Sequence, residues 1–499
     1  MARPGFVHEV DTRTPPLLIP TGDTFRLERL PLGTQVVYPP EALPALPDVE
    51  AAIDEALGQP LGSDPLADRL RAGMKLTIAF DDVTVPAPRM RRPDIRGRII
   101  EKVLGLAAAA GVDDVELLVG NGLQRRITQA EMLHLLGERV FRSFFADGRL
   151  NNHDATDVHG SINARAAESD LLVYVHVTVS PLGNGVAAVL KGLGPAELLL
   201  ERGGLDAVRS GQTEPVPEWG TLPPIFSVEA VLDNNAFPTG LDFLAKREWE
   251  WSLRDRMTSS AVMRALELAP AKARRRLVNS AEASFGVIQV RAGDPGAVAE
   301  ASASKVRQQQ LVEVKGQADV MITGVGQHSP YSADSVLNPI LAAWMALGHT
   351  FAAHTGLPVV REGGALIVYH PAVNEFSSLH HPSYVDFFAD VLSAGTDATE
   401  VRDTFQAKYA EDAWYAHLYR SGNAYHGAHP FLLWYQLSRA VEHCGDIIWV
   451  GADIATVERL GFRSASTLHD ALEIVAPTVG RTPKISYLHQ PTHLIADVR

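Results

Sequence analysis

The 499-residue chain has a single cysteine, Cys444, which excludes an intrachain disulfide and a cysteine-based metal site. It has no dense Lys/Arg tract, and its net charge is −14, from 45 basic and 59 acidic residues. A nucleic acid or an anionic membrane is therefore disfavoured as a partner. Its longest apolar run, residues 104–112, is too short to span a bilayer, and its first ten residues lack the apolar core of a signal peptide. We therefore expect a soluble, cytoplasmic protein.

The composition is that of a globular protein, with 46% apolar and 21% charged residues. A chain of this length exceeds one ordinary core, so we expect two domains, residues 1–293 and 294–499. The first domain begins with a proline-rich stretch and contains an insertion at about 236–284, interpreted as a lid or a subunit contact.

Apolar runs that read as strands alternate with helical periodicity in both halves of the chain. Strands are expected at 74–80, 115–119, 171–179, 286–290, 319–325, 365–369, 446–450 and 484–488. Helices are expected at 93–110, 129–137, 186–202, 255–277, 297–312, 333–348, 384–394, 431–443 and 467–475. The alternation predicts an α/β fold whose two domains have mostly parallel sheets flanked by helices.

Two aspartates, Asp81 and Asp82, end the strand at 74–80, where open α/β sheets place ligands. A carboxylate there would act as a base or bind a substrate hydroxyl. A turn or helix-cap aspartate is the equally weighted alternative. Asp82 begins an Asp-x-Thr-x-Pro turn that also contains Thr84, and we select it as the catalytic candidate because this turn aligns with the family motif named below.

Two further strand-to-helix loops carry candidate groups. Gln124 and Arg125 follow the strand at 115–119, and the Arg125 guanidinium offers a two-pronged donor for a carboxylate or phosphate. Gly183, Asn184 and Gly185 precede a helix whose N-terminus would bind an anion, with Lys191 adding positive charge. The alternatives are a surface arginine, a plain tight turn and a solvated lysine.

His328 follows the strand at 319–325 and is the best acid/base candidate of the second domain, because histidine titrates near neutrality. Its alternative is a histidine bonded to its own loop. His426 and His429 suggest a metal, but a catalytic metal needs three or four convergent ligands, so the metal ligands stay unknown.

Several landmarks, in order, resemble the lactate racemase family. They are the Asp82 turn, Gly120–Arg125, Asn152-His153-Asp154, the glycine-rich segment 181–192, Arg291–Pro295 and Gly363-Gly364. The resemblance covers roughly residues 74–390. It implies a site in an inter-domain cleft, a nickel-pincer nucleotide cofactor contacted by Thr84 and the 183–185 loop, and two acid/base histidines.

The chain departs from that family at its chemistry. The first acid/base histidine falls on Gln124 and the second near Val177, with His176 one residue away and thus expected on the opposite face of its strand. The lysine that holds the cofactor falls on Ala187, and no histidine for nickel occurs at 201–203. The nickel-pincer nucleotide is therefore doubtful.

We expect a racemase or epimerase of a small hydroxy acid or related carboxylate, with Asp82, Gln124, Arg125 and His328 at its site. One alternative is a nickel-independent lyase or hydrolase that reuses the cleft. The other is a non-catalytic paralogue that binds a small anion. A homo-oligomer is left open.

Overall fold

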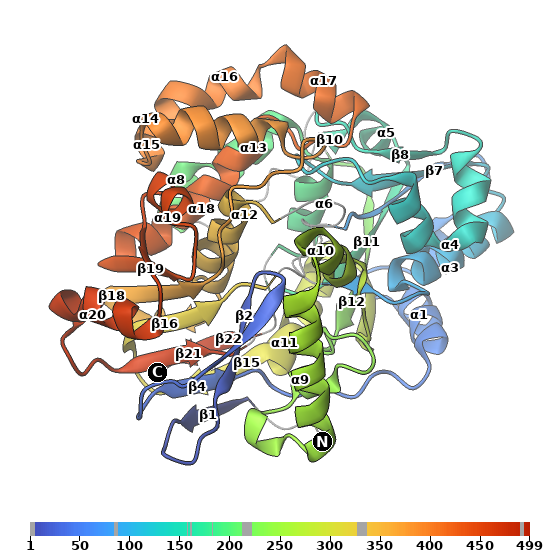
Figure 1. The fold of residues 1–499 in the computed structure, drawn as a ribbon. Helices are drawn as coiled ribbons and strands as arrows, with labels where there is room; N and C mark the ends of the chain where they lie inside the picture. The colour runs from blue at the N-terminus through green and yellow to red at the C-terminus, as the bar shows by residue number, and fades with distance from the viewer. Residues whose placement is uncertain are drawn as a thin grey trace.

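The structure is a computed structural model that describes residues 5–83, 88–156, 158–159, 162–181, 183–211, 222–326, 337–489 and 494–499. Two large sheets, each flanked by helices, dominate it (Figure 1). The predicted α/β class with mostly parallel sheets is confirmed. Within the described ranges, no helix is both long and apolar enough to cross a membrane.

The first sheet has six strands in the order β14-β12-β11-β5-β7-β8. They are β5 (Lys75–Asp81), β7 (Asp114–Gly120), β8 (Leu150–Asn152), β11 (Leu171–Thr178), β12 (Ile225–Leu232) and β14 (Val287–Gly293). Neighbours are parallel except for β12 and β14. Their parallel arrangement brings the ends of β5, β7, β11 and β12 to one edge, which positions the site described below.

Helices cover both faces of this sheet, which explains why its strands read as continuous apolar runs. On one face, α3 (Ile95–Ala109) and α4 (Gln129–Phe145) pack against the side chains of β5 and β11, together with α1 (Val49–Gly58). On the other face lies α6 (Val186–Leu193), whose Val189 and Leu190 contact Ala79 and Tyr174. The predicted 186–202 helix is broken at Gly194 into α6 and α7 (Ala196–Arg202).

The second sheet has seven strands in the order β1-β4-β21-β16-β18-β19-β20. They are β1 (Phe6–Glu9), β4 (Gln35–Tyr38), β16 (Ala318–Gly324), β18 (Val360–Tyr369), β19 (Asp446–Val450), β20 (Arg463–Ala465) and β21 (Ile485–Leu488). Only β1 and β4 are antiparallel neighbours. Helices α12 (Pro339–Ala343) and α18 (His429–His443) pack on one face, and α20 (Leu468–Val479) packs on the other.

The proline-rich start is more ordered than its composition suggests. It contains β1, β4 and the hairpin of β2 (Leu17–Thr21) and β3 (Thr24–Glu28). Since β4 pairs with β21, residues that we assigned to the first domain complete the sheet of the second. Helix α11 (Pro295–Gln310), whose N-terminus is capped by Asp294, follows the predicted domain boundary.

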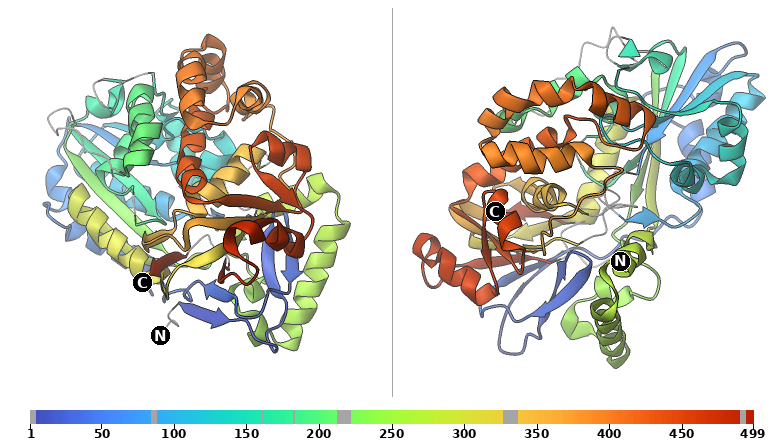
Figure 2. Two further views of the ribbon diagram at one scale, coloured as in Figure 1. Left: turned by 90° about the vertical axis from the view of Figure 1, so that its left-hand side faces the viewer. Right: turned by 45° about the horizontal axis from the view of Figure 1, so that its top comes forward.

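The insertion at 236–284 contains α9 (Leu253–Leu268) and α10 (Ala271–Ser280), visible as the light-green helices in Figures 1 and 2. It is tied to the rest of the chain by the buried Glu248. This carboxylate accepts hydrogen bonds from the Leu18 amide and the Tyr38 hydroxyl, and it pairs with His489. Trp251 is buried in a small core with Leu18, so it is not available as a surface contact.

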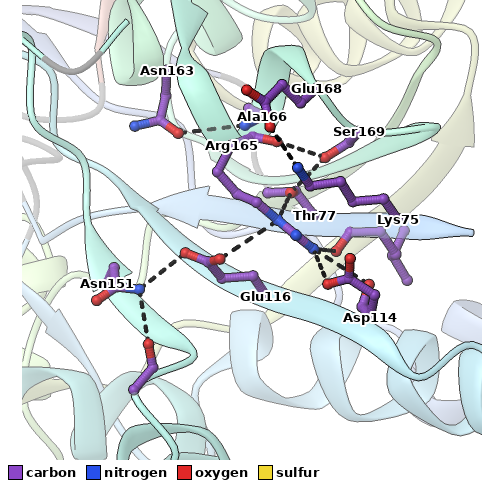
Figure 3. Close-up of polar contacts among 12 residues, drawn as sticks. Lys75, Thr77, Asp114, Glu116, Asn151, Asn163, Arg165, Ala166, Glu168 and Ser169 are labelled. Atoms are coloured by element: carbon purple, nitrogen blue, oxygen red, sulfur yellow. Dashed lines mark hydrogen bonds and ion pairs between the residues drawn. The ribbon is translucent and has the colours of Figure 1, made fainter.

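A polar network lies at the amino-terminal edge of the first sheet (Figure 3). Arg165, from the short helix α5 (Ala164–Ala167), donates to Thr77 and pairs with Asp114 and Glu116. Lys75 pairs with Glu168. These contacts fix α5 against the starts of β5 and β7.

Candidate functional site

The strongest cluster of ionisable groups lies at the opposite, carboxyl-terminal edge of the first sheet. Asp81, the last residue of β5, accepts a hydrogen bond from His176 on β11, with 2.7 Å between Asp81 Oδ2 and His176 Nδ1. The amide of Val177 also donates to Asp81 Oδ2 at 2.7 Å, and the Tyr174 hydroxyl donates to its other oxygen at 3.3 Å. The side chains of Asp81 and His176 are 12% and 16% exposed, so this pair is largely buried yet not sealed from water.

The two-residue period of β-strands explains the pairing. Ala79 shares one core with Tyr174 and α6, whereas Phe80 packs in the core on the opposite face. Asp81 therefore follows Ala79 onto the α6 side, where Tyr174 and His176 also lie. His176 thus lies on the face opposite Val177, as the one-residue shift along a strand predicts, because Val177 packs in the core with Phe80.

The charges around His176 hold it in its protonated form. Burial lowers the pKa of its imidazole, but Asp81 and then Glu229 and Asn184 outweigh burial and raise the pKa to about 9. Burial raises the pKa of Asp81, yet the positive charge and hydrogen bond of His176 bring it below its usual range. At neutral pH the site thus contains an imidazolium that is hydrogen-bonded to the Asp81 carboxylate.

The loop of Gly183, Asn184 and Gly185 closes over this pair. Asn184 Oδ1 lies 3.1 Å from His176 Nε2, and Asn184 Nδ2 donates to the Ser180 carbonyl at 3.2 Å. The Gly185 amide donates to the buried Glu229 at 2.8 Å, and Thr178 donates to the other oxygen of Glu229. Gly185 has φ +62°, and a Cβ there would lie 2.5 Å from the Pro295 carbonyl oxygen, so only glycine fits. One amide of the predicted anion loop is therefore already bonded to a carboxylate of the chain itself.

Arg125 is paired within the chain. Its two terminal nitrogens donate to Glu131 at 2.9 and 2.6 Å, and both side chains are buried. Burial raises the pKa of Glu131, but the hydrogen bonds and charge of Arg125 outweigh it and lower the pKa to about 2. Glu131 is also the N3 residue of α4, where it forms a capping box with the N-cap residue Thr128. A substrate carboxylate would have to displace Glu131 to use this guanidinium.

The remaining predicted residues lie in varied settings. Asp82 is buried, and its backbone carbonyl accepts from Arg96 at 2.7 Å. Gln124 lies half-buried in the loop after β7, where its backbone N–H donates to the backbone carbonyl of Asn121. Lys191 is exposed on α6 and lowers the pKa values of His349 and His429, which places it beside the second sheet's helices. Thr84 and His328 lie outside the described residues.

The loop after β7 is where the two halves of the chain meet. The Tyr419 hydroxyl donates to the Gly122 carbonyl at 2.6 Å, and the His426 amide donates to the Leu123 carbonyl. His429 shares a short hydrogen bond with the Tyr384 hydroxyl, and burial lowers the pKa of His429 to about 3. Within the described ranges, no cluster of three or more His, Cys, Asp or Glu side chains could hold a metal ion, so the metal suggested at His426 and His429 gains no further ligands.

Comparison with known proteins finds a family that is similar to part of this chain. Residues 28–179 match the family of the lactate racemase N-terminal domain. This segment of the chain is therefore similar to that family.

One solved structure supports this fold. The lactate racemase apoprotein from Thermoanaerobacterium thermosaccharolyticum superposes with a TM-score of 0.62 at 17% identity, covering 96% of this chain and 99% of that one. A structural-genomics protein from Thermotoga maritima gives a TM-score of 0.48 at 12% identity, over 90% and 98% of the two chains. No curated protein matches the sequence.

The Asn152-His153-Asp154 landmark of the superfamily has a structural role in this chain. Asn152 bonds both backbone groups of Ile127, and His153 bonds the Gly194 carbonyl at 3.0 Å. Burial lowers the pKa of His153 to about 4, so it is neutral at physiological pH. The motif therefore holds the loop after β7 and the end of α6 together.

The residues of this chain fit a lysine-tethered nickel-pincer nucleotide poorly. Ala187 occupies the tether position in the first turn of α6. The nearest lysine, Lys191, lies a turn further on, and the histidines it influences are His349 and His429 rather than His176. We derive no step through that cofactor.

Three functional side chains were missed or undervalued by sequence reasoning: Asp81, His176 and Glu229. The alternation Thr77-Ala79-Asp81 carried a signal for the first of these. Glu229 could not be found, because it interrupts the apolar strand β12, which the sequence analysis did not assign.

Proposed function

We propose that this chain is a lactate racemase-like enzyme that acts on a small 2-hydroxy acid or a related carboxylate, as a racemase or epimerase. The observation that carries the proposal is the Asp81–His176 pair at the carboxyl edge of a parallel sheet, partly open to water. Ligands of open α/β sheets bind at that edge. The similarity of residues 28–179 to the lactate racemase N-terminal domain supports the substrate class.

His176 would be the acid/base residue. As an imidazolium it attracts a substrate carboxylate or hydroxyl oxygen. Its Nε2 would donate a proton to that oxygen while a base removes the α-proton, and would recover its proton when the α-carbon is protonated again on the opposite face. Asp81 holds the ring through Nδ1, so that Nε2 is the nitrogen that faces the substrate. His176 would thus supply the positive charge for which Arg125 was considered, since Arg125 is bound by Glu131.

A lyase is the second candidate, and a specific observation favours it. Among the described residues, His176 is the histidine of this site, and Gln124, which stands where the family has a second, cannot exchange a proton near neutrality. A protonated histidine suits the loss of water from a hydroxy acid. In that reaction the C–O bond breaks, the His176 proton goes to the departing hydroxide, and a base removes the neighbouring C–H proton to form the double bond.

The deciding experiment incubates the purified protein with a panel of 2-hydroxy acids, from lactate to malate and mandelate, in D₂O. Chiral chromatography measures enantiomers, and mass spectrometry measures α-deuterium and unsaturated products. Conversion of one enantiomer into the other supports the racemase. An unsaturated acid would instead support the lyase. If no acid in the panel changes while the protein binds it, the chain is a binding paralogue and the proposal is overturned.

A further inference from the structure

His176 has no free ring nitrogen in this structure. Its Nδ1 bonds Asp81 at 2.7 Å, and its Nε2 bonds Asn184 Oδ1 at 3.1 Å. A carbonyl oxygen accepts and cannot donate, so the Asn184 bond requires a proton on Nε2. The nitrogen that the proposed function assigns to substrate is thus occupied by a neutral side chain.

The loop that carries Asn184 is built so that this side chain can be released. Gly183 and Gly185 flank it with φ angles of +78° and +62°, which only glycine adopts at little cost. The Gly185 amide is fixed by Glu229, whereas the Asn184 side chain has weaker links, at 3.1 and 3.2 Å to His176 and the Ser180 carbonyl. Asn184 is half-buried and Gly183 is exposed, so the side chain can leave toward water.

We propose that Asn184 is a displaceable positioning residue that occupies the proton-transfer nitrogen of His176 until a substrate oxygen takes its place. The inference rests on the proposed function for the identity of the displacing oxygen. A hydroxyl or carboxylate oxygen can accept from Nε2 as Asn184 Oδ1 does, so the exchange replaces one hydrogen bond by another of the same type. Asn184 therefore sets the free-energy cost of substrate binding and influences the protonation of His176, and it affects the reaction only through His176.

The titratable groups that face His176 come from three strands. They are Asp81 on β5, Glu229 on β12, and Tyr174, which is on β11 and bonds Asp81. None of them contacts Nε2 in this structure. Replacing Asn184 thus alters the nitrogen that faces the substrate while the Asp81 contact at Nδ1 is kept.

Two substitutions at this position have opposite expected effects. Asn184→Ala removes the competing hydrogen bond, so KM should fall about 3- to 10-fold with kcat within about 2-fold. Asn184→Asp provides a charged acceptor that a substrate displaces with difficulty, so KM should rise about 10-fold or more. Asn151→Ala, which removes an exposed amide from the amino edge of the sheet, is the matched control and should change neither constant.

A second measurement works without turnover. Nitrogen-15 NMR of the histidine rings, with the His176 signal assigned from His176→Gln, reports the protonation and bonding of Nε2 across pH. In Asn184→Ala the pKa of His176 should move from about 9 toward its ordinary value, and sodium lactate should shift the Nε2 signal more at equal concentration than in the wild type.

The two readouts keep the proposals separate. If the wild type converts no 2-hydroxy acid, the proposed function fails, and the NMR titration still decides whether Asn184 occupies Nε2. If the Nε2 signal and its pKa are the same in Asn184→Ala and the wild type, the positioning role is overturned. It is also overturned if Asn184→Ala and Asn184→Asp raise KM alike, since a merely structural role predicts that result.

Discussion

The two edges of the first sheet carry similar charged side chains but differ in how deeply these side chains are buried. At the amino edge, Arg165 pairs with Asp114 and Glu116, which are 58% and 23% exposed (Figure 3). At the carboxyl edge, His176 pairs with an Asp81 that is 12% exposed and lies near a buried Glu229. Water screens the first cluster more than the second, and the second raises the pKa of His176 to about 9.

The difference shows why ion pairs alone do not locate a functional site in this chain. What distinguishes the carboxyl edge is burial combined with one cation, His176, whose pKa two carboxylates raise. The buried Arg125–Glu131 pair lies at the same edge, yet its charges match one to one and both terminal nitrogens of Arg125 donate to Glu131. We expect it to behave as a structural pair.

The largest expected effect is that of replacing His176 at the carboxyl edge. His176→Gln should lower the rate of hydroxy-acid conversion by about 10²- to 10⁴-fold, because the proton-transfer group is gone. Arg165→Ala, at the other edge, should leave the rate within about 2-fold. Steady-state assays of both variants check this, and equal losses would mean that the two edges do not differ in function.

Glu131→Gln tests whether Arg125 is structural. It should lower the free energy of unfolding by about 3–5 kcal/mol, because a buried guanidinium loses its counter-charge. The control is Glu138→Gln on the same helix, whose exposed partner Arg142 makes a change of less than about 1 kcal/mol expected. Urea denaturation measures both, and a small effect for Glu131→Gln would return Arg125 to the list of substrate-binding groups.

The pH dependence of stability sharpens the contrast further. Because the folded pKa of His176, about 9, lies above its ordinary 6.5, its stabilisation is fully present below about pH 6.5 and is lost as pH rises through 9. The slope from this group should not exceed about 1.4 kcal/mol per pH unit. Asp81→Asn should flatten it. Urea midpoints between pH 6 and 10 provide the test, and an unchanged slope would remove Asp81 as the main partner.

The smallest expected effect is at the amino edge. Arg165→Ala should cost about 1–2 kcal/mol of unfolding free energy through its lost hydrogen bonds to Thr77 and Leu76. The pH profile of stability between 6 and 10 should keep the wild-type shape. A changed profile would show that the two edges are coupled through the sheet.

Much of the first sheet could be predicted from the sequence, because β5, β7 and β11 are covered on both faces and read as apolar runs. Strand β12 was missed although all its residues are buried, since Ser227 and Glu229 interrupt the apolar pattern. The proline-rich start hid β1 to β4. The parallel partner of β4, strand β21, lies more than 400 residues along the chain, beyond the range of local patterns. Pairing over that separation is a property of the tertiary structure, which local sequence patterns do not reveal.

The site was predicted in part. The edge and the glycine loop were located correctly as the places where polar groups gather, because strand ends in parallel sheets are regular. The choice of Asp82 over Asp81 followed a motif, whereas which aspartate meets His176 depends on the face of the strand. The bond from Arg125 to Glu131 joins a loop to a capping box, and neither side chain reveals the other in the sequence.

The pairing of β4 with β21 also has a consequence for synthesis on the ribosome. The strands at 6–38 emerge first, but the edge that they complete is the last part of the chain to be made. The first sheet, built from residues 75–293, can close while the chain is still growing. Until translation reaches residue 488, β4 has no parallel neighbour and keeps an unpaired edge, so the earliest segment of the polypeptide is the one most in need of a chaperone.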